Sequence, residues 1–554
     1  MSRRRGGKGA RREGAEEARE AVGPARSPGA ARNSDSAKPP PATSTKRALV
    51  AALALVACGA AFLLAAHVAF YFPSWTDENV HLYVARRITE GAVLYRDIDS
   101  ARPPLVLLPL AVLIRLGVAP LFAARAIVVV TALATAFAIY LGGRRLFSPR
   151  AAVLAAALYL IAPEMTSRVQ YSGIQLVELG VTAGLLLALL GRPLAAGIGF
   201  GLALAAGQHS VVIAAVAAIW LLVRAPRRAG WFIAGGLLAL GVVFGLVRSM
   251  GAAHVWENLV ARHLYHFGAA AGSDTSEFAP LMKGWLEDNL VIFALAVTGV
   301  VVAVRGGGRA EASVAGRVMA TAIAAHLLAL AIMSGALFLY VIPIFPLVAL
   351  LAGWGADRIA SWVSEAGEGE GRWWRAGWVA AAVVAVALFG WKLAYDSAIK
   401  ILPRGASIAF LPHPRIGRLM RLQKLDVAAL IAQQLGARLP KEATVFGHAP
   451  LVAQVALDGH RRVSGELADL PPRWIERGVI TRDALINRIE SDAVGAIVTP
   501  RWLLMRDPRL RAYLTGCYAP PDVHPRPTSG DGDGLPDIYV FVRKGVLRPC
   551  TGGS

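Results

Sequence analysis

Two carboxylates and one arginine within residues 75–105 have the types and the spacing for acid–base chemistry beside a phosphate. Asp77 and Glu78 are adjacent, and Arg102 stands immediately before two prolines. A carboxylate can act as a general base toward a hydroxyl or an amine. A guanidinium is permanently charged and can bind phosphate oxygens with two donors. Because this segment follows the first long apolar run, we expect the chemistry at a membrane face.

The composition places the chain among membrane proteins. Hydrophobic residues make up 55% of the sequence and the mean hydropathy is +0.50, which exceeds what a soluble protein can bury. The net charge of +21 would suit a nucleic-acid partner, but the cations lie in short clusters between apolar runs. That distribution is typical of cytoplasmic loops between membrane spans. We therefore predict a polytopic α-helical membrane protein without a nucleic-acid partner.

The N-terminal part divides into a tail, a span and a surface helix. Residues 1–46 are rich in Arg, Gly, Ala, Pro and Ser, which predicts a disordered, basic cytoplasmic tail. Residues 48–72 are long and apolar enough to cross the membrane. Residues 77–91 have apolar positions at helical spacing, which predicts an amphipathic helix along the outer surface.

The basic loops decide how the next segments are counted. Residues 103–118 contain three prolines and Arg115, so we expect them to lie in the interface without crossing. Every later basic loop then falls inside, whereas counting 103–118 as a span would invert them all. The later spans are predicted at residues 121–141, 151–163, 174–190, 231–247, 290–304, 315–333, 337–354 and 378–395, with two short spans within 194–223.

The break within 194–223 follows from length. One helix over this stretch would be about 45 Å long, against a hydrocarbon core of about 30 Å. Two short spans that meet outside at residues 207–210 fit better. The total is about eleven spans, with the N-terminus inside and the C-terminus outside.

From about residue 401 the pattern changes to that of a soluble α/β domain, predicted over residues 401–554 and placed in the periplasm by the topology. Some 150 residues are enough for a domain with its own core. We predict helices at 425–439 and 482–489 and strands at 443–446, 494–498 and 538–542. Cys517 and Cys550 both fall in this outer domain, and we expect them to form a disulfide, with two independent thiols as the alternative.

The order of features after the first span resembles the first outer loop of the GT-C glycosyltransferases. These features are an acidic pair, an amphipathic helix, a tyrosine-aspartate turn and a basic-Pro-Pro-Leu run. The group it resembles most is family 39, which includes protein O-mannosyltransferases and the lipid A aminoarabinose transferases. The run YVIPIFPLVALLAG at residues 340–353 also resembles a late-helix signature of this family. The resemblance implies a transmembrane catalytic domain over residues 47–400, with its catalytic loop at 73–120.

The resemblance implies roles for three acids. Asp77 matches the family's catalytic aspartate and would be the general base on the acceptor, and Glu78 would orient Asp77 or the sugar. Glu178 stands where relatives carry a second acid at the outer start of a later helix. Judged from the residues alone, Asp77 and Glu78 could equally be solvated acids that begin a helix, and Glu178 an interfacial one.

The resemblance also implies a cation for the donor phosphate. Arg102 matches the basic residue before the prolines, and an interfacial arginine that snorkels is the alternative. His209 lies in a turn where relatives often have Lys or Arg, and Arg125 is a further cation to test. No cofactor is assigned, and a divalent metal stays possible.

These features predict an inverting glycosyltransferase at the outer face of a bacterial inner membrane. It would move a hexosyl or pentosyl group from a polyprenyl-phosphate donor to a lipid, glycan or protein acceptor, surrounded by membrane lipids. The alternatives are a lipid-linked-sugar transporter or flippase and a cell-envelope assembly protein. A transporter needs ionisable residues along a path through the bilayer midplane. The predicted acids and Arg102 gather at one face, which favours the transferase.

Overall fold

The structure is a computed structural model that describes a large part of the 554-residue chain. The described residues are 59, 63, 77–162, 165, 170–249, 254–256, 258–259, 278–306, 309–332, 338–365, 427–466, 481–500, 508–524 and 538–544. The predicted tail at 1–46, the predicted span at 378–395 and Cys550 lie outside these residues, and of the predicted span at 48–72 only residues 59 and 63 are described.

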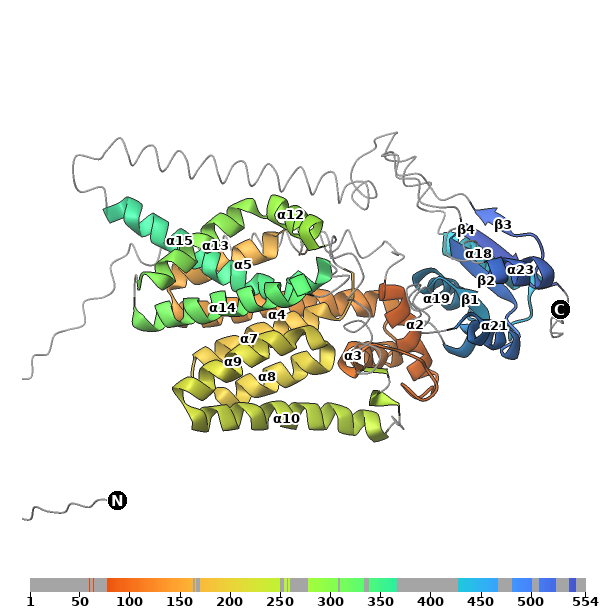
Figure 1. Cartoon of the computed structure of the whole chain (residues 1–554), viewed down its shortest axis with the longest axis horizontal. Helices are drawn as coiled ribbons and strands as arrows, with labels where there is room; N and C mark the ends of the chain where they lie inside the picture. The colour runs from red at the N-terminus through yellow and green to blue at the C-terminus, as the bar shows by residue number, and fades with distance from the viewer. Residues whose placement is uncertain are drawn as a thin grey trace, which may run out of the picture. The chain divides into compact units, whose positions relative to one another are not determined.

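Helices dominate the described part of residues 77–365 (Figure 1). They are α2 (Asp77–Thr89), α3 (Pro104–Arg115), α4 (Pro120–Leu146), α5 (Pro149–Ile161), α7 (Ile174–Leu189), α8 (Pro193–Ala206), α9 (Val211–Arg224), α10 (Pro226–Ser249), α12 (Phe278–Asp288), α13 (Leu290–Val304), α14 (Ala310–Ile332) and α15 (Phe345–Glu365), with 3-10 segments η1 (Gln208–Ser210) and η5 (Phe338–Ile344).

Proline marks where many of these helices begin. Pro104, Pro120, Pro149, Pro193 and Pro226 are each the first residue of a helix. A first-turn residue needs no backbone N–H partner, and the ring of proline holds φ near the helical value. The sequence therefore specifies these starts locally, without help from tertiary packing.

Small residues let neighbouring helices approach closely. A Cβ added to Gly197 of α8 would lie 1.9 Å from the Phe232 carbonyl oxygen of α10, and one added to Gly184 of α7 would lie 2.7 Å from the Phe200 ring of α8. Figure 1 shows α8 beside α7 and α10. Lipid is as apolar as a leucine side chain, so close van der Waals contact between small residues is what holds such helices together.

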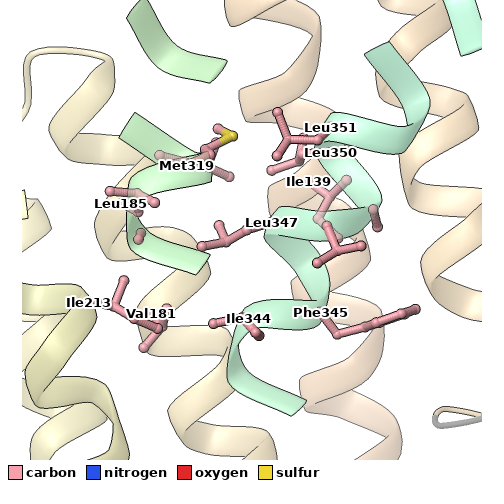
Figure 2. Packing of buried hydrophobic residues seen from close by; sticks show 14 of the residues in the cluster. Ile139, Val181, Leu185, Ile213, Met319, Ile344, Phe345, Leu347, Leu350 and Leu351 are labelled. Carbon is pink, nitrogen blue, oxygen red and sulfur yellow. The ribbon is translucent and has the colours of Figure 1, made fainter. Parts of the chain in front are cut away.

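The core of the helical region lies between α4, α7, α9, α14 and α15. Figure 2 shows side chains of α15 and η5 lying against those of the other four helices. The labelled residues are Ile139, Val181, Leu185, Ile213, Met319, Ile344, Phe345, Leu347, Leu350 and Leu351, and all are buried. Interdigitation of this kind fixes the rotation of each helix about its axis.

Helix ends that carry the predicted inner-side residues meet one another. Arg309, just before α14, donates to the Phe147 carbonyl after α4. Ser148 caps α5 by accepting from the Ala151 amide (3.0 Å) and donates to Asp357 of α15 (2.7 Å). The ends of α4, α14 and α15 that the charge pattern assigns to one side of the membrane thus lie together.

Four described helical stretches are long and apolar enough to cross a membrane: α4, α10, α14 and Tyr340–Ser364. A fifth is reached if α12 and α13, which are bent by 92°, form one span. Several other predicted spans coincide with apolar helices of 10–17 residues, α5, α7 and α8 among them. The described residues therefore form a mostly helical protein with four to five candidate spans, and the predicted count of about eleven is not confirmed.

Two finer sequence-based predictions concern breaks and surface segments. α8 ends at Ala206 and α9 begins at Val211, with η1 between them, so the predicted interruption is confirmed. The proline-rich segment predicted to stay in the interface forms α3, which is 12 residues long. A helix of that length spans about 18 Å, less than the bilayer core.

The C-terminal region contains a four-stranded sheet in the order β1-β2-β4-β3. β1 (Val445–Gly447) pairs in parallel with β2 (Ala496–Pro500), whereas β4 (Ile538–Val542) is antiparallel to both β2 and β3 (Asp522–His524). The helices are α18 (Val427–Arg438), α19 (Ala449–Asp458), α21 (Arg482–Ser491) and α23 (Pro508–Cys517). Both predicted helices and all three predicted strands have counterparts here, and α19, α23 and β3 were not predicted.

Cys517 at the end of α23 is 4% exposed and forms a disulfide. The predicted partner, Cys550, lies outside the described residues. The pairing of these two cysteines therefore stays a prediction.

Helix α2 packs against the C-terminal region as well as against the other helices. Asn79 donates to the Pro450 carbonyl (3.3 Å), and the Tyr83 hydroxyl accepts from the Val463 amide (2.8 Å). Apolar residues of α2, α3, α18 and α19 share one buried cluster. The first turn of α2, where Asp77 and Glu78 lie, is thus held by packing along the rest of the helix.

Arg461 stabilises the C-terminal region from within. Its guanidinium is buried and donates to the carbonyls of Leu435 (3.0 Å), Leu439 (3.0 Å) and Ala443 (3.2 Å), and to that of Pro440. The Leu435 and Pro440 carbonyls also accept from the amides of Leu439 (2.9 Å) and Ala443 (3.1 Å), whereas those of Leu439 and Ala443 lie beyond the end of α18, where helical partners run out. One side chain thus satisfies the last turn and the turn that follows it.

We predict that Arg461→Met destabilises the protein by about 2 to 4 kcal/mol, because several buried carbonyls lose their donor. The measurement is the apparent melting temperature of the full-length protein in detergent. The matched control is Arg438→Met, which removes a half-exposed ion pair with Asp522 and should cost under about 1 kcal/mol. Equal shifts in the two variants would show that the carbonyls do not depend on Arg461.

Candidate active site

The first turn of α2 carries an acid that solvent can reach. The Asp77 carboxylate accepts a hydrogen bond from Arg102 Nη2 at 2.7 Å. The two side chains are 41% and 29% exposed. An ion pair with this exposure is weak in itself, so both groups remain accessible to a substrate.

The segment before α3 determines where Arg102 lies. The Arg102 amide donates to Ser100 Oγ (3.2 Å). Pro103 is extended, with φ of −60° and ψ of 150°, and Pro104 begins α3. Proline fixes its own φ and restricts the backbone conformation of the residue before it. The Pro103-Pro104 pair therefore leaves this turn few allowed backbone conformations. Arg102 is thereby directed from the start of α3 toward the start of α2.

Glu78, one residue further along α2, is buried. It accepts from Arg125 of α4 through Nη2 (2.9 Å) and Nε (3.3 Å), and it also accepts from the Tyr171 amide (2.9 Å). The Glu78 and Arg125 side chains are 0% and 2% exposed. A two-donor pair of this kind joins three parts of the chain that are far apart in sequence: α2, α4 and the segment before α7.

Tyr171 completes this buried junction. Its hydroxyl donates to the Val106 carbonyl of α3 (2.5 Å), and its carbonyl lies 3.2 Å from Nδ1 of the buried His81. Burial raises the pKa of the Tyr171 phenol, so this hydroxyl remains a donor across the physiological range. The N-terminal half of α2, the start of α3 and the residues before α7 are therefore hydrogen-bonded into one unit.

Glu178 belongs to a second polar network, inside the helix bundle. Its carboxylate accepts from the Tyr159 hydroxyl of α5 (3.0 Å), and Thr135 of α4 lies near that hydroxyl. Glu178 is 1% exposed. Thr135 lies about 15 Å further along α4 than Arg125 at 1.5 Å per residue, so the two networks meet α4 at different depths.

His209 stacks against an aromatic residue of the late segment. Its ring centroid is 4.1 Å from that of Tyr340 in η5, with the planes 28° apart. Nε2 of the buried His326 on α14 lies 2.8 Å from the Tyr340 carbonyl. Gly207, beside the His209 turn, approaches Val177, the neighbour of Glu178. The His209–Tyr340 pair therefore lies near the inner network.

The structure thus arranges the sequence-predicted residues in two groups. Asp77 meets Arg102 and Glu78 meets Arg125, whereas Glu178 and His209 meet tyrosines that the sequence reasoning did not select. Their catalytic or phosphate-binding roles stay predictions. The sequence signal for Tyr159 was a lone phenol inside an apolar helix, where a hydroxyl needs a partner. The Tyr171 amide has no such signal, since every residue but proline carries one.

Metal binding was left open by the sequence. Within the parts of the chain that the structure describes, no group of three or more His, Cys, Asp or Glu side chains could hold a metal ion.

No protein-family model matches the chain, and no curated protein sequence matches it. Among solved structures it is similar to ArnT from Cupriavidus metallidurans bound to undecaprenyl phosphate, with 16% identity over 91% of this chain and 99% of that chain and a TM-score of 0.58. The apo state of the same protein matches at 16% identity, over 90% and 98%, with a TM-score of 0.55. The chain shares the fold of ArnT, which is a member of the GT-C superfamily.

The GT-C fold confirms the resemblance seen in the first outer loop. A remoter likeness is to the oligosaccharyltransferase AglB from Archaeoglobus fulgidus in complex with an inhibitory peptide and a dolichol-phosphate, at 12% identity over 89% of this chain and 77% of that one, with a TM-score of 0.48. At such identities the likeness concerns the arrangement of helices. The roles of individual residues must come from their own contacts.

We predict that Glu78→Gln destabilises the protein by about 3 to 5 kcal/mol, because it leaves the Arg125 charge buried without its counter-ion. The added change Arg125→Met should recover most of this loss, because it removes the charge. Apparent melting temperatures of the single and double variants measure the effect. As a control, Asp483→Asn breaks an ion pair whose partners are both 74% exposed and should shift the melting temperature little. A Glu78→Gln shift as small as the control's would contradict the prediction.

Proposed function

We propose that this protein is an inverting glycosyltransferase that uses a sugar linked to a polyprenyl phosphate. The observation that carries the proposal is the accessible Asp77–Arg102 pair, set beside the buried Glu78–Arg125 pair at the start of α2. The GT-C fold supports it, because the structurally similar ArnT has been solved with undecaprenyl phosphate bound.

The reaction needs a base and a cation. Phosphate is a good leaving group, so the barrier lies in activating the acceptor and in stabilising the charge that forms on the phosphate. Asp77 accepts the proton of the acceptor hydroxyl or amine as its oxygen or nitrogen attacks the anomeric carbon. The bond from that carbon to the phosphate oxygen breaks with its electron pair on the phosphate. Attack opposite the leaving group inverts the configuration.

Arg102 is the cation for the donor phosphate in this proposal. Its guanidinium has five N–H donors and can hold Asp77 and a phosphate oxygen together. Arg125 is an alternative phosphate ligand from the sequence, but its side chain is 2% exposed and bound to Glu78. We therefore assign Arg125 and Glu78 to holding the start of α2 in place, and Arg102 to the phosphate.

Glu178 and His209 have secondary places in the proposal. Glu178 is the second acid of the proposal; because it is 1% exposed and bound to Tyr159, it would influence the donor through its charge and not through direct contact. His209, held flat against Tyr340, offers a ring nitrogen to the phosphate or the sugar. The Glu178–Tyr159 contact joins α7 to α5, and the His209–Tyr340 contact joins η1 to η5.

The membrane arrangement is part of the proposal. About eleven spans would place the start of α2 and the C-terminal α/β domain on the periplasmic side of a bacterial inner membrane, with the N-terminus cytoplasmic. The meeting of the ends of α4, α14 and α15 supports this, because the basic loops join these ends. The positive-inside rule then assigns them to the cytoplasmic side.

A lipid-linked-sugar transporter is the second candidate. Glu178 is an ionisable residue buried inside the helix bundle, and such residues often mark a transport path. The two candidates differ in product. Only a transferase yields a new glycosidic bond, which mass spectrometry detects after the purified protein is incubated with total lipid extract of the host.

We predict that Asp77→Asn lowers turnover by about 10² to 10⁴-fold, the usual contribution of a general base. The amide keeps the shape of the side chain but cannot accept the proton. Turnover is measured per folded molecule in nanodiscs supplied with the same lipid extract. Asp483→Asn, which also loses an ion pair with an arginine, should keep full turnover. Near-normal turnover of Asp77→Asn would exclude Asp77 as the base.

We predict that Arg102→Ala loses both donor affinity and turnover, because the negative charge on the phosphate grows as the glycosidic bond breaks. Arg102→Lys should recover part of the loss, since the charge remains without the two-donor geometry. Turnover is measured against the amount of lipid extract, with Arg509→Ala as the exposed control. An interfacial anchor predicts a different result: lower expression with unchanged kinetic constants per folded molecule.

A further inference from the structure

Tyr95 has a backbone conformation that a tyrosine rarely adopts. Its φ is +68°, in the left-handed region that glycine and asparagine tolerate and that bulky side chains avoid. Its side chain is also buried, at 3% exposure. A glycine here would avoid the strain, so some contact of the tyrosine side chain must offset it.

The hydroxyl of Tyr95 provides that contact. It donates to the Arg102 carbonyl at 2.7 Å. Arg102 is therefore held on both sides of its Cα, because its amide is already bound to Ser100 Oγ at 3.2 Å. These two hydrogen bonds hold the main chain of Arg102 and so determine the position from which its long, partly exposed side chain extends.

The turn that carries Tyr95 is itself rigid. The Asp97 amide donates to the Val93 carbonyl (2.8 Å), and the Asp97 carboxylate accepts from the Val93 amide (2.8 Å). Leu94 and Ile98 form a β-bridge and are 1% and 0% exposed. Because these flanking residues restrain the turn, the Cα of Tyr95 has a defined position, and its hydroxyl is therefore placed at the Arg102 carbonyl.

We propose that Tyr95 is a positioning residue for Arg102. Its hydroxyl holds the Arg102 main chain so that the guanidinium extends to Asp77, 2.7 Å away, and is already in place when a donor phosphate binds. The left-handed backbone conformation of Tyr95 directs its ring toward that carbonyl, and the hydrogen bond offsets the strain. The kinetic part of this inference rests on the proposed function, whereas the placement of Arg102 does not.

Tyr95→Phe tests the placement, because it keeps the ring and removes only the hydroxyl. The probe is phenylglyoxal, which modifies arginine side chains, with the rate at each arginine read by peptide mass spectrometry. We expect the rate at Arg102 to rise about threefold or more as its tether is lost, in line with one lost hydrogen bond. Arg96, in the same turn and 55% exposed in an ion pair with Asp97, is the internal control and should not change.

Two further variants separate placement from general loosening of the fold. Tyr518→Phe also removes a buried hydroxyl that donates to a carbonyl, that of Val494 (3.1 Å), and should leave the Arg102 rate unchanged. Ser100→Ala removes the other tether and should raise the Arg102 rate in the same direction, so the inference stays testable if Tyr95→Phe folds poorly. An unchanged Arg102 rate in a folded Tyr95→Phe or Ser100→Ala protein overturns the proposal.

The kinetic test uses a double-mutant cycle. Tyr95→Phe should lower donor kcat/KM about tenfold in the wild-type background and have little effect in Arg102→Ala, because the tether then holds nothing that binds phosphate. Equal losses in both backgrounds would mean that Tyr95 acts through packing, which overturns the proposal. Absence of sugar transfer by the wild-type protein would overturn the proposed function alone, since the phenylglyoxal rates would still report on Arg102.

Discussion

The buried ion pair between Glu78 and Arg125 is the constraint on which the rest of the site depends. Both side chains are removed from water, and an unpaired charge at such a position is costly. The pair therefore holds only where α2, α4 and the Tyr171 amide keep their mutual positions. Since Asp77 directly precedes Glu78, the contacts that hold Glu78 in place also determine the position of the Asp77 Cα.

Adjacent acids at the start of one helix have opposite environments here. Successive residues on a helix point about 100° apart, so when Glu78 faces the core, Asp77 faces outward. Asp77 keeps 41% exposure and Glu78 none. The same chemical group thus serves two purposes, and only the exposed one can meet a substrate. The proposed proton-transfer site can therefore lie directly beside a rigid structural junction.

Small residues at helix contacts, together with the buried apolar core, hold the helices around the site. Close contacts at Gly184 and Gly197 bring α7, α8 and α10 together, and the C-terminal region supports α2 through Asn79 and Tyr83. Tyr95 and Ser100 add a local restraint on Arg102. These hydrogen bonds involve main-chain groups, whereas the charged ends of Asp77 and Arg102 meet each other at a partly exposed position.

Much of the architecture follows from the sequence by itself. Composition indicated a membrane protein, the break before Val211 followed from helix length, and short apolar runs indicated strands β1, β2 and β4. The acidic pair and the Arg-Pro-Pro run also indicated the site. These are local properties, set by backbone geometry and by the periodicity of apolar residues.

The pairing of charges was decided only by the tertiary structure. Asp77 binds Arg102, 25 residues away, and Glu78 binds Arg125, 47 residues away, although nothing in the sequence distinguishes these two arginines as partners. The choice depends on how far each helix is rotated about its axis, which the packing of distant small and apolar residues determines. The partners of Glu178 and His209 were undetermined for the same reason. Contacts between helices depend on the whole bundle, and no short stretch of sequence carries that information.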